Sequence, residues 1–197
     1  MGNTGPSALT PFVRSDAQGA VLAETLGHPE NEVSISELSR RTASSLATTH
    51  REVQRLIRSG VLVERRDGNN RLVRANQEHP LFALMSQLVV ETYGPQPVLR
   101  ALLADVPGVV EAFVYGSWAA RRTGTEGPFP RDIDVMVVGS LALDDLLDIQ
   151  ERARALLHRE VNIHRTTVAD WHSPDGNPFL TTVRSRPLVP LVGGEHE

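Results

Sequence analysis

The sequence contains neither cysteine nor lysine, so all 20 of its Lys+Arg positions are arginine. Without cysteine, disulfides, thiolate metal sites and cysteine nucleophiles are excluded. Without lysine, Schiff-base chemistry and the lysine of a P-loop are excluded as well. No apolar run approaches the roughly 20 residues of a membrane-spanning helix, and the N-terminal stretch MGNTGPSALTPF has neither the charged nor the apolar region of a signal peptide. We therefore expect a cytoplasmic protein with no membrane partner.

What remains is the composition of an ordinary globular protein. The 197 residues are 40% hydrophobic and 22% charged, and they suffice for one large or two small domains. The net charge of −4 is unevenly distributed: residues 1–76 hold ten arginines and eight acidic residues, a balance of +2, whereas residues 77–197 hold ten and sixteen, a balance of −6. Because the first part is only mildly basic, an argument for nucleic-acid binding must rest on pattern rather than bulk charge.

The stretch from Glu111 to Ser140 carries the clearest chemical pattern. It begins with an apolar run, turns at Gly116-Ser117, passes through a helix-prone segment and a Gly/Pro-rich loop, and returns as Asp132-Ile133-Asp134 before a second apolar run. Because a strand repeats every two residues, the two aspartates project from the same face. Such a pair is costly unless a cation compensates it, and Mg²⁺ takes oxygen ligands that it shares with phosphates. The Gly-Ser turn offers a phosphate close backbone approach, a hydroxyl and exposed N–H groups.

Gly116-Ser117 followed by Asp132-x-Asp134 resembles the signature of the minimal nucleotidyltransferases in the DNA polymerase β superfamily. The resemblance implies a small mixed α/β domain in which the Gly-Ser pair holds a nucleoside triphosphate and the two aspartates bind the Mg²⁺ that assists nucleotidyl transfer. It also implies that Arg121 or Arg122 reaches a phosphate, although family members often carry this arginine one residue earlier, with a glycine after it. The alternative is an ordinary βαβ unit whose strand-end aspartates are solvated.

The third strand, Arg159 to Arg165, bears on catalysis. Active members of the superfamily carry a third carboxylate there, which completes the metal site and draws the proton from the attacking hydroxyl. In this chain that position falls on Asn162, whose amide cannot usefully accept a proton. Glu160 lies on the same face, about 6.6 Å away along a strand, and substitutes only if the register or loop brings it inward. The resemblance therefore implies Mg²⁺–NTP binding. An active enzyme that transfers NMP to a protein or RNA hydroxyl, with Glu160 or Asn162 in its catalytic set, stays open.

The first part of the chain is predicted to form three helices and a hairpin. A serine begins each helix: Ser15 one that runs to about Gly27, Ser34 a short one that opens with a capping box, and Ser45 a longer one with Leu46 among its buried positions. Two alternating strands around the turn Asp67-Gly68-Asn69-Asn70 then predict a β-hairpin within residues 61–75.

Three helices followed by a basic hairpin resemble a winged helix-turn-helix of the ArsR and MarR types over residues 15–76. The resemblance implies binding to double-stranded DNA, with the helix that begins at Ser45 in the major groove and the hairpin arginines on phosphates or in a minor groove. The residues implied are Ser45, Thr48, Thr49 and Arg51 on the helix and Arg65, Arg66, Arg71 and Arg74 on the hairpin. Alternatively, the hairpin is a solvated face and the helices mediate protein contacts.

Together these patterns predict an α+β protein with a winged helix-turn-helix at residues 15–76, a connecting helix and linker at residues 77–97, and a nucleotidyltransferase-like domain at residues 98–197. The connecting helix packs either against its twin in a homodimer or onto its own two domains. The leading function is a bacterial DNA-binding transcriptional regulator with Mg²⁺–NTP as ligand, acting as a sensor or as the antitoxin-like half of a toxin–antitoxin pair, with a toxin or target protein as partner. An active nucleotidyltransferase and a pure interaction module are the alternatives.

Overall fold

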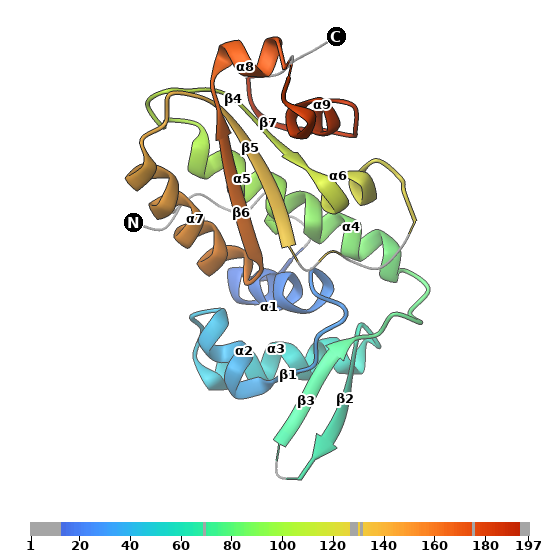
Figure 1. Ribbon diagram of the computed structural model, residues 1–197. Coiled ribbons are helices and arrows are strands. Elements are labelled where there is room, and N and C mark those ends of the chain that lie inside the picture. Colours follow the sequence, from blue (N-terminus) through green and yellow to red (C-terminus); the bar gives the residue numbers. More distant parts are fainter. Residues whose placement is uncertain (1–12, 69, 127–129, 131, 175, 194–197) are drawn as a thin grey trace. The chain divides into compact units, whose positions relative to one another are not determined.

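A computed structural model describes residues 13–68, 70–126, 130, 132–174 and 176–193 of the chain. It contains helices together with two separate sheets, so the predicted α+β class is confirmed (Figure 1). The chain divides into two compact units, Met1–Gly94 and Pro95–Glu197, and each has its own sheet and its own core. Within the described residues, no helix combines the length and the apolar character needed to cross a membrane.

The first unit contains the three predicted helices and the predicted hairpin. Its elements are α1 (Asp16–Leu26), β1 (Val33–Ser34), α2 (Ile35–Arg41), α3 (Leu46–Arg58), β2 (Leu62–Asp67), β3 (Asn70–Ala75) and α4 (Phe82–Tyr93). Strands β2 and β3 are antiparallel, and Asp67 pairs with Asn70 next to the turn. The sheet has the order β1-β3-β2 because the two-residue β1 adds to the other edge of β3, also antiparallel.

Serine caps define where the first three helices begin. In each case the serine Oγ accepts a hydrogen bond of 3.2 Å from the backbone N–H three residues on: Ser15 from Gln18, Ser34 from Glu37 and Ser45 from Thr48. These bonds satisfy N–H groups that have no partner inside a helix, and they confirm the predicted helix starts. The Glu37 carboxylate binds Arg40 and Arg41 of its own helix, and these hydrogen bonds lower its pKa to about 2.

The core of the first unit joins all of its elements except the tip of the hairpin. Its fully buried members include Val21, Leu26, Leu38, Val53, Leu62 and Val73. The prediction that Leu46 is buried is wrong, because this side chain is 54% exposed. It follows the capping serine directly and lies in the first turn of α3, whereas the buried Val53 and Leu56 lie in later turns of the helix.

Helix α4 belongs to the first unit through its contacts with α1. The Ser86 hydroxyl donates a hydrogen bond of 2.9 Å to the carbonyl of Leu26, and both residues are buried. Tyr93 lies so close to Gly19 that a Cβ at Gly19 would be 2.3 Å from the tyrosine hydroxyl. The glycine therefore lets the end of α4 approach the α1 backbone.

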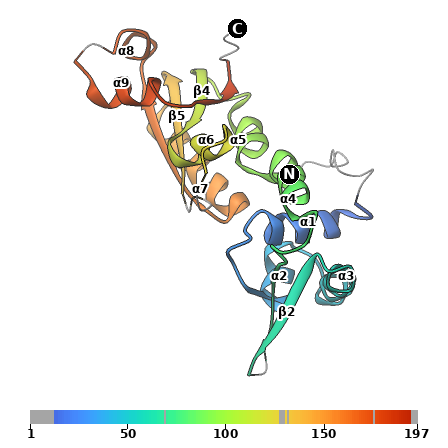
Figure 2. The same cartoon turned by 90° about the vertical axis from the view of Figure 1, so that its right-hand side faces the viewer.

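The second unit is built on a mixed four-stranded sheet. Its elements are α5 (Pro95–Leu103), β4 (Val109–Tyr115), α6 (Gly116–Arg122), β5 (Asp132–Gly139), α7 (Leu143–Leu157), β6 (Glu160–Thr166), α8 (Val168–His172), α9 (Pro178–Arg184) and β7 (Val189–Val192). The strand order is β6-β5-β4-β7, with β5 and β6 parallel and the other pairs antiparallel. In Figure 2, α8 and α9 lie to the left of the strands and α5 lies to the right.

The two faces of this sheet are covered by different helices. On one face Phe113, Tyr115 and Met136 form a core with residues of α8 and α9, namely Trp171, Leu180 and Val183. The alternate positions, such as Val114 and Val135, point to the other face, where α5 and α7 pack. Asp132 and Asp134 have the parity of Met136, so they project from the face that α8 and α9 border.

Candidate functional site

The turn between β4 and α6 brings Gly116 against the second aspartate of β5. Gly116 has φ +73°, a left-handed conformation that disfavours side chains, and a Cβ there would lie 2.7 Å from Asp134 Oδ2. In the same turn Ser117 is exposed. The structure thus places the Gly-Ser pair beside one of the two carboxylates, and only glycine permits the observed distance.

Asp134 meets Asn162 on its other side. The parallel register aligns Asp134 with Asn162 and Asp132 with Glu160. The Asn162 amide, Nδ2, donates a hydrogen bond of 3.2 Å to Asp134 Oδ1. The position implied for a third carboxylate is therefore held by an amide that orients Asp134 and brings no negative charge of its own.

Glu160 is engaged by a helix rather than by the aspartates. Its carboxylate forms an ion pair of 3.0 Å with Arg154 of α7. Across the described residues, no three or more His, Cys, Asp or Glu side chains gather in a way that could hold a metal ion. A Mg²⁺ ion at this edge of the sheet would therefore rely on Asp132 and Asp134, with water and phosphate oxygens as its other ligands.

The two arginines of α6 lie at its C-terminal end. Arg121 donates a hydrogen bond of 3.0 Å from Nη1 to the carbonyl of Thr125, which helps to close the segment after the helix. Arg122 is exposed. Their contact with a phosphate stays a prediction.

Two residues that the sequence reasoning missed, Tyr115 and His164, adjoin the carboxylates. The tyrosine hydroxyl lies 3.0 Å from His164 Nδ1, and the ring is buried. Burial, and secondarily the negative charge of Asp134, raise the pKa of Tyr115 to about 12. Both could have been predicted from the sequence. His164 follows Asn162 by two residues, so the strand period puts the two side chains on one face, and Tyr115 is the residue directly before Gly116.

We expect the phenol of Tyr115 to titrate near pH 12 in the folded protein. Since the folded pKa lies above the ordinary 10.0, its contribution to stability is complete below pH 10 and is lost as the pH rises toward 12. Tyrosinate absorbance in a Tyr93→Phe background, which leaves one tyrosine, measures this pKa directly. Asp134→Asn should lower it, while leaving it above 10 because burial is the larger cause. Asp144→Asn, with the same charge change on α7, is the control. If the two variants give the same tyrosinate titration curve, the charge of Asp134 does not act on Tyr115.

In the first unit, α3 presents most of the predicted DNA-contacting residues at its N-terminal end. Ser45 and Arg51 are exposed and Thr48 is half-buried. The prediction for Thr49 is wrong. Its side chain is fully buried, and its hydroxyl donates to the carbonyl of Ser45 at 3.1 Å. Thr49 shares the inward side of the helix with Val53, so it cannot reach a base edge.

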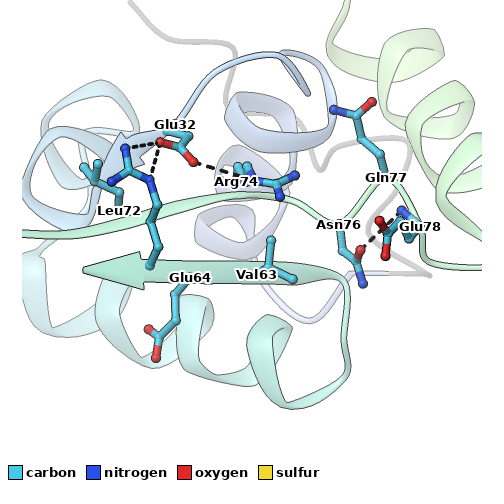
Figure 3. A pocket seen from close by; sticks show the side chains of 9 residues that line it. Glu32, Val63, Glu64, Leu72, Arg74, Asn76, Gln77 and Glu78 are labelled. Carbon is cyan, nitrogen blue, oxygen red and sulfur yellow. Dashed lines mark hydrogen bonds and ion pairs between the residues drawn. The ribbon is translucent and has the colours of Figure 1, made fainter. Parts of the chain in front are cut away.

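Carboxylates of the same unit pair with three of the four hairpin arginines. Glu32 binds Arg65 at 2.6 Å and Arg74 at 3.6 Å, and Glu64 binds Arg71. Figure 3 shows Glu32 and Arg74 in a cleft of about 280 Å³ beside the hairpin. The hydrogen bond from Arg65 is the main cause that lowers the pKa of Glu32 below its ordinary 4.5. The fourth arginine, Arg66, is exposed and forms no ion pair with any described residue.

A basic cleft of about 340 Å³ opens between α3 and the start of α1. Its charged lining consists of Arg14, Arg51, Arg55 and Glu52, and Ser15 and Thr48 add hydroxyls. Arg55 is tied to the buried Glu52 at 2.6 Å. Of this set, the sequence predicted only Thr48 and Arg51 as DNA contacts, although the spacing 48, 51 and 55 already places three residues on one side of a helix.

Comparisons with known proteins do not identify the chain. No family model matches it, and no curated protein matches it in sequence. Among solved structures, the heme sensor protein PefR from Streptococcus agalactiae in complex with heme is 16% identical, with 45% of this chain and 59% of that chain covered and a TM-score of 0.32. Pseudomonas aeruginosa HmgR is 25% identical, with 54% and 45% covered and a TM-score of 0.29. The match thus spans about half the length of each of these proteins, at TM-scores too low to support a fold or a function.

Proposed function

We propose that the protein is a DNA-binding regulator whose second unit binds a nucleoside triphosphate with Mg²⁺. The observation that carries the nucleotide half is the position of Asp134, held between the Gly116 backbone on one side and the Asn162 amide on the other. A glycine forced into a left-handed turn against a carboxylate suits a site where a phosphate and a metal ion meet. Asp132, two residues earlier on the same face, would supply the second carboxylate.

The same geometry favours binding over nucleotidyl transfer. The residue opposite Asp134 is an amide, which donates to the carboxylate and cannot take a proton from an attacking hydroxyl. The observation that keeps transfer as a second candidate is the alignment of Glu160 with Asp132. Because the Arg154–Glu160 pair is largely exposed, a bound substrate could draw the carboxylate inward at little cost.

The DNA half of the proposal rests on the first unit alone. Helix α3 is capped by Ser45 and exposes Arg51, and the adjoining hairpin carries Arg65, Arg66, Arg71 and Arg74. This order of helices, hairpin and arginines fits a winged helix-turn-helix with α3 in the major groove and the hairpin on the backbone. Arg14 and Arg55, in the cleft beside α3, would add phosphate contacts.

Calorimetry tests the nucleotide half. We expect the full chain to bind NTP only when Mg²⁺ is present, and we expect Asp132→Asn/Asp134→Asn to bind at least about a hundredfold more weakly, because both metal-binding carboxylates are removed. Asp144→Asn/Asp145→Asn, which removes two exposed acidic charges from the first turn of α7, is the matched control. If the folded wild type binds no common NTP in the presence of Mg²⁺, the proposed nucleotide binding is wrong. If binding is found, Asn162→Asp tests whether a third carboxylate restores transfer of NMP.

Footprinting on the DNA upstream of its own gene tests the other half. We expect Arg51→Ala and Arg66→Ala each to weaken protection and to reduce the slope of log K against log salt by about 0.9 for each phosphate that the variant no longer neutralises. Arg152→Ala, an exposed arginine paired with Asp148 in the second unit, controls for net charge. Equal DNA binding by all three variants would show that Arg51 and Arg66 make no DNA contact, whereas no protection by the wild type would favour an interaction module over a regulator.

A further inference from the structure

An exposed phenylalanine of α9 lies beside the carboxylate site. The Phe179 side chain is 45% exposed, whereas the next residue, Leu180, is 3% exposed and fills the core with Val183. The Phe179 ring contacts two residues of the sheet. Its centroid lies 6.1 Å from that of Tyr115, edge to face, and 5.6 Å from that of His164, tilted by 53°.

The strand register places these three rings next to the aspartates. Tyr115 is aligned with Asp134, and His164 is aligned with Met136, one strand repeat beyond Asn162. That repeat measures about 6.6 Å. Further along the same face the sheet is closed, because Phe113 stacks on Trp171 at 5.5 Å inside the core. The rings therefore stand at the border between the closed core and the polar row of Asp134 and Asn162.

We propose that Phe179 and His164 form a stacking platform for the base of a nucleotide whose phosphates are held through Mg²⁺ at Asp132 and Asp134. This proposal rests on the proposed function of the same site. An exposed aromatic ring offers a flat apolar surface to the π-face of any base. His164 lies one strand repeat beyond Asn162, which binds Asp134, so the platform adjoins the position proposed for the phosphates. Tyr115 supports the platform from the buried side, because its ring is buried and its hydroxyl lies 3.0 Å from His164 Nδ1.

The platform also predicts the kind of specificity. Stacking recognises the face of a base and not its hydrogen-bonding edge, so it tolerates all bases and favours the larger purines. We therefore expect ATP and GTP to bind with similar affinity and CTP and UTP more weakly, and we expect inorganic tripolyphosphate, which has no base, to bind most weakly of all.

Calorimetry with two ligands separates the platform from the metal site. On the full chain with Mg²⁺, Phe179→Ala should weaken ATP binding by about 5- to 150-fold and leave tripolyphosphate binding unchanged, while Phe179→Tyr keeps ATP affinity near wild type. Val168→Ala removes an exposed apolar side chain from neighbouring α8 and is the control. Circular dichroism establishes that each variant is folded.

The outcomes distinguish the two ideas. If the wild type binds tripolyphosphate and ATP equally, or if Phe179→Ala binds ATP as the wild type does, the platform is overturned and the phosphate site stands. If Phe179→Ala weakens both ligands alike, Phe179 supports the fold of the site and not the base, and the platform is again overturned. If the wild type binds neither ligand, the proposed nucleotide function fails and the platform fails with it.

Discussion

Gly116→Ala is expected to abolish Mg²⁺–NTP binding and to lower the free energy of unfolding by about 1–3 kcal/mol. Two causes act together. The backbone at φ +73° disfavours any side chain, and the added methyl group would lie 2.7 Å from Asp134 Oδ2. Asp134 must rotate to relieve that contact, and we expect the rotation to break its hydrogen bond with Asn162 and to move the carboxylate away from the position proposed for the metal ion.

Gly176→Ala separates these two causes. Gly176 also has a positive φ, +84°, and belongs to the same unit, but a Cβ there would meet no atom within 4 Å. We expect this control to lose stability through backbone strain alone and to keep nucleotide affinity. Calorimetry and chemical denaturation measure both quantities for both variants. If Gly116→Ala binds Mg²⁺–NTP as tightly as Gly176→Ala does, the close approach to Asp134 has no role in the site.

Local signals predict the first unit well because its helix starts and its hairpin depend on neighbours in sequence. The serine at each helix start needs only an N–H three residues away, and the turn between β2 and β3 needs only its own residues. Strands β1 and β7 have two and four residues and exist because a partner strand is present, so their pattern alone does not predict them. Thr49 lies inward because it shares a side of α3 with the buried Val53, and Leu46 is exposed because the hydrophobic core of the unit takes no residue from the first turn of this helix. Both outcomes depend on tertiary packing.

The carboxylate site, like the first unit, is predicted from the sequence where it depends on neighbouring residues, and is not predicted where it depends on other elements. The two-residue period predicts that Asp132 and Asp134 share a face, and it also contains Asn162 and His164 once β6 is placed beside β5. The strand period does not predict which side chains of other elements contact these residues. Glu160 pairs with Arg154 of α7, and the ring of Phe179 belongs to α9, which is separated from β6 by α8 and a loop. Contacts between elements depend on packing, which no single segment encodes.

At the hairpin, Glu32→Gln is expected to tighten DNA binding about tenfold at moderate salt and to steepen the salt dependence. Glu32 lies 33 residues before Arg65 and binds both Arg65 and Arg74, so a single carboxylate engages two arginines of the predicted DNA surface in the free protein. Each must exchange a carboxylate for a phosphate when DNA binds. Removing the carboxylate charge removes that competition, and up to two further phosphate contacts steepen the slope of log K against log salt by up to about 1.8.

Near neutral pH the pairing of Glu32 with the arginines does not depend on pH, so we expect DNA, if it binds as proposed, to be what displaces this carboxylate. Its pKa is lowered from 4.5 by Arg65, so the pairing is complete above pH 4.5 and disappears only as the pH falls through the lower folded value. Glu78→Gln is the matched control, since Glu78 lines the same cleft and its carboxylate has no ion pair among the described residues. Electrophoretic mobility shifts at several salt concentrations compare the two. Equal gains for both variants would mean that net charge alone is responsible, whereas a gain confined to Glu32→Gln identifies this carboxylate as the competitor that DNA must displace.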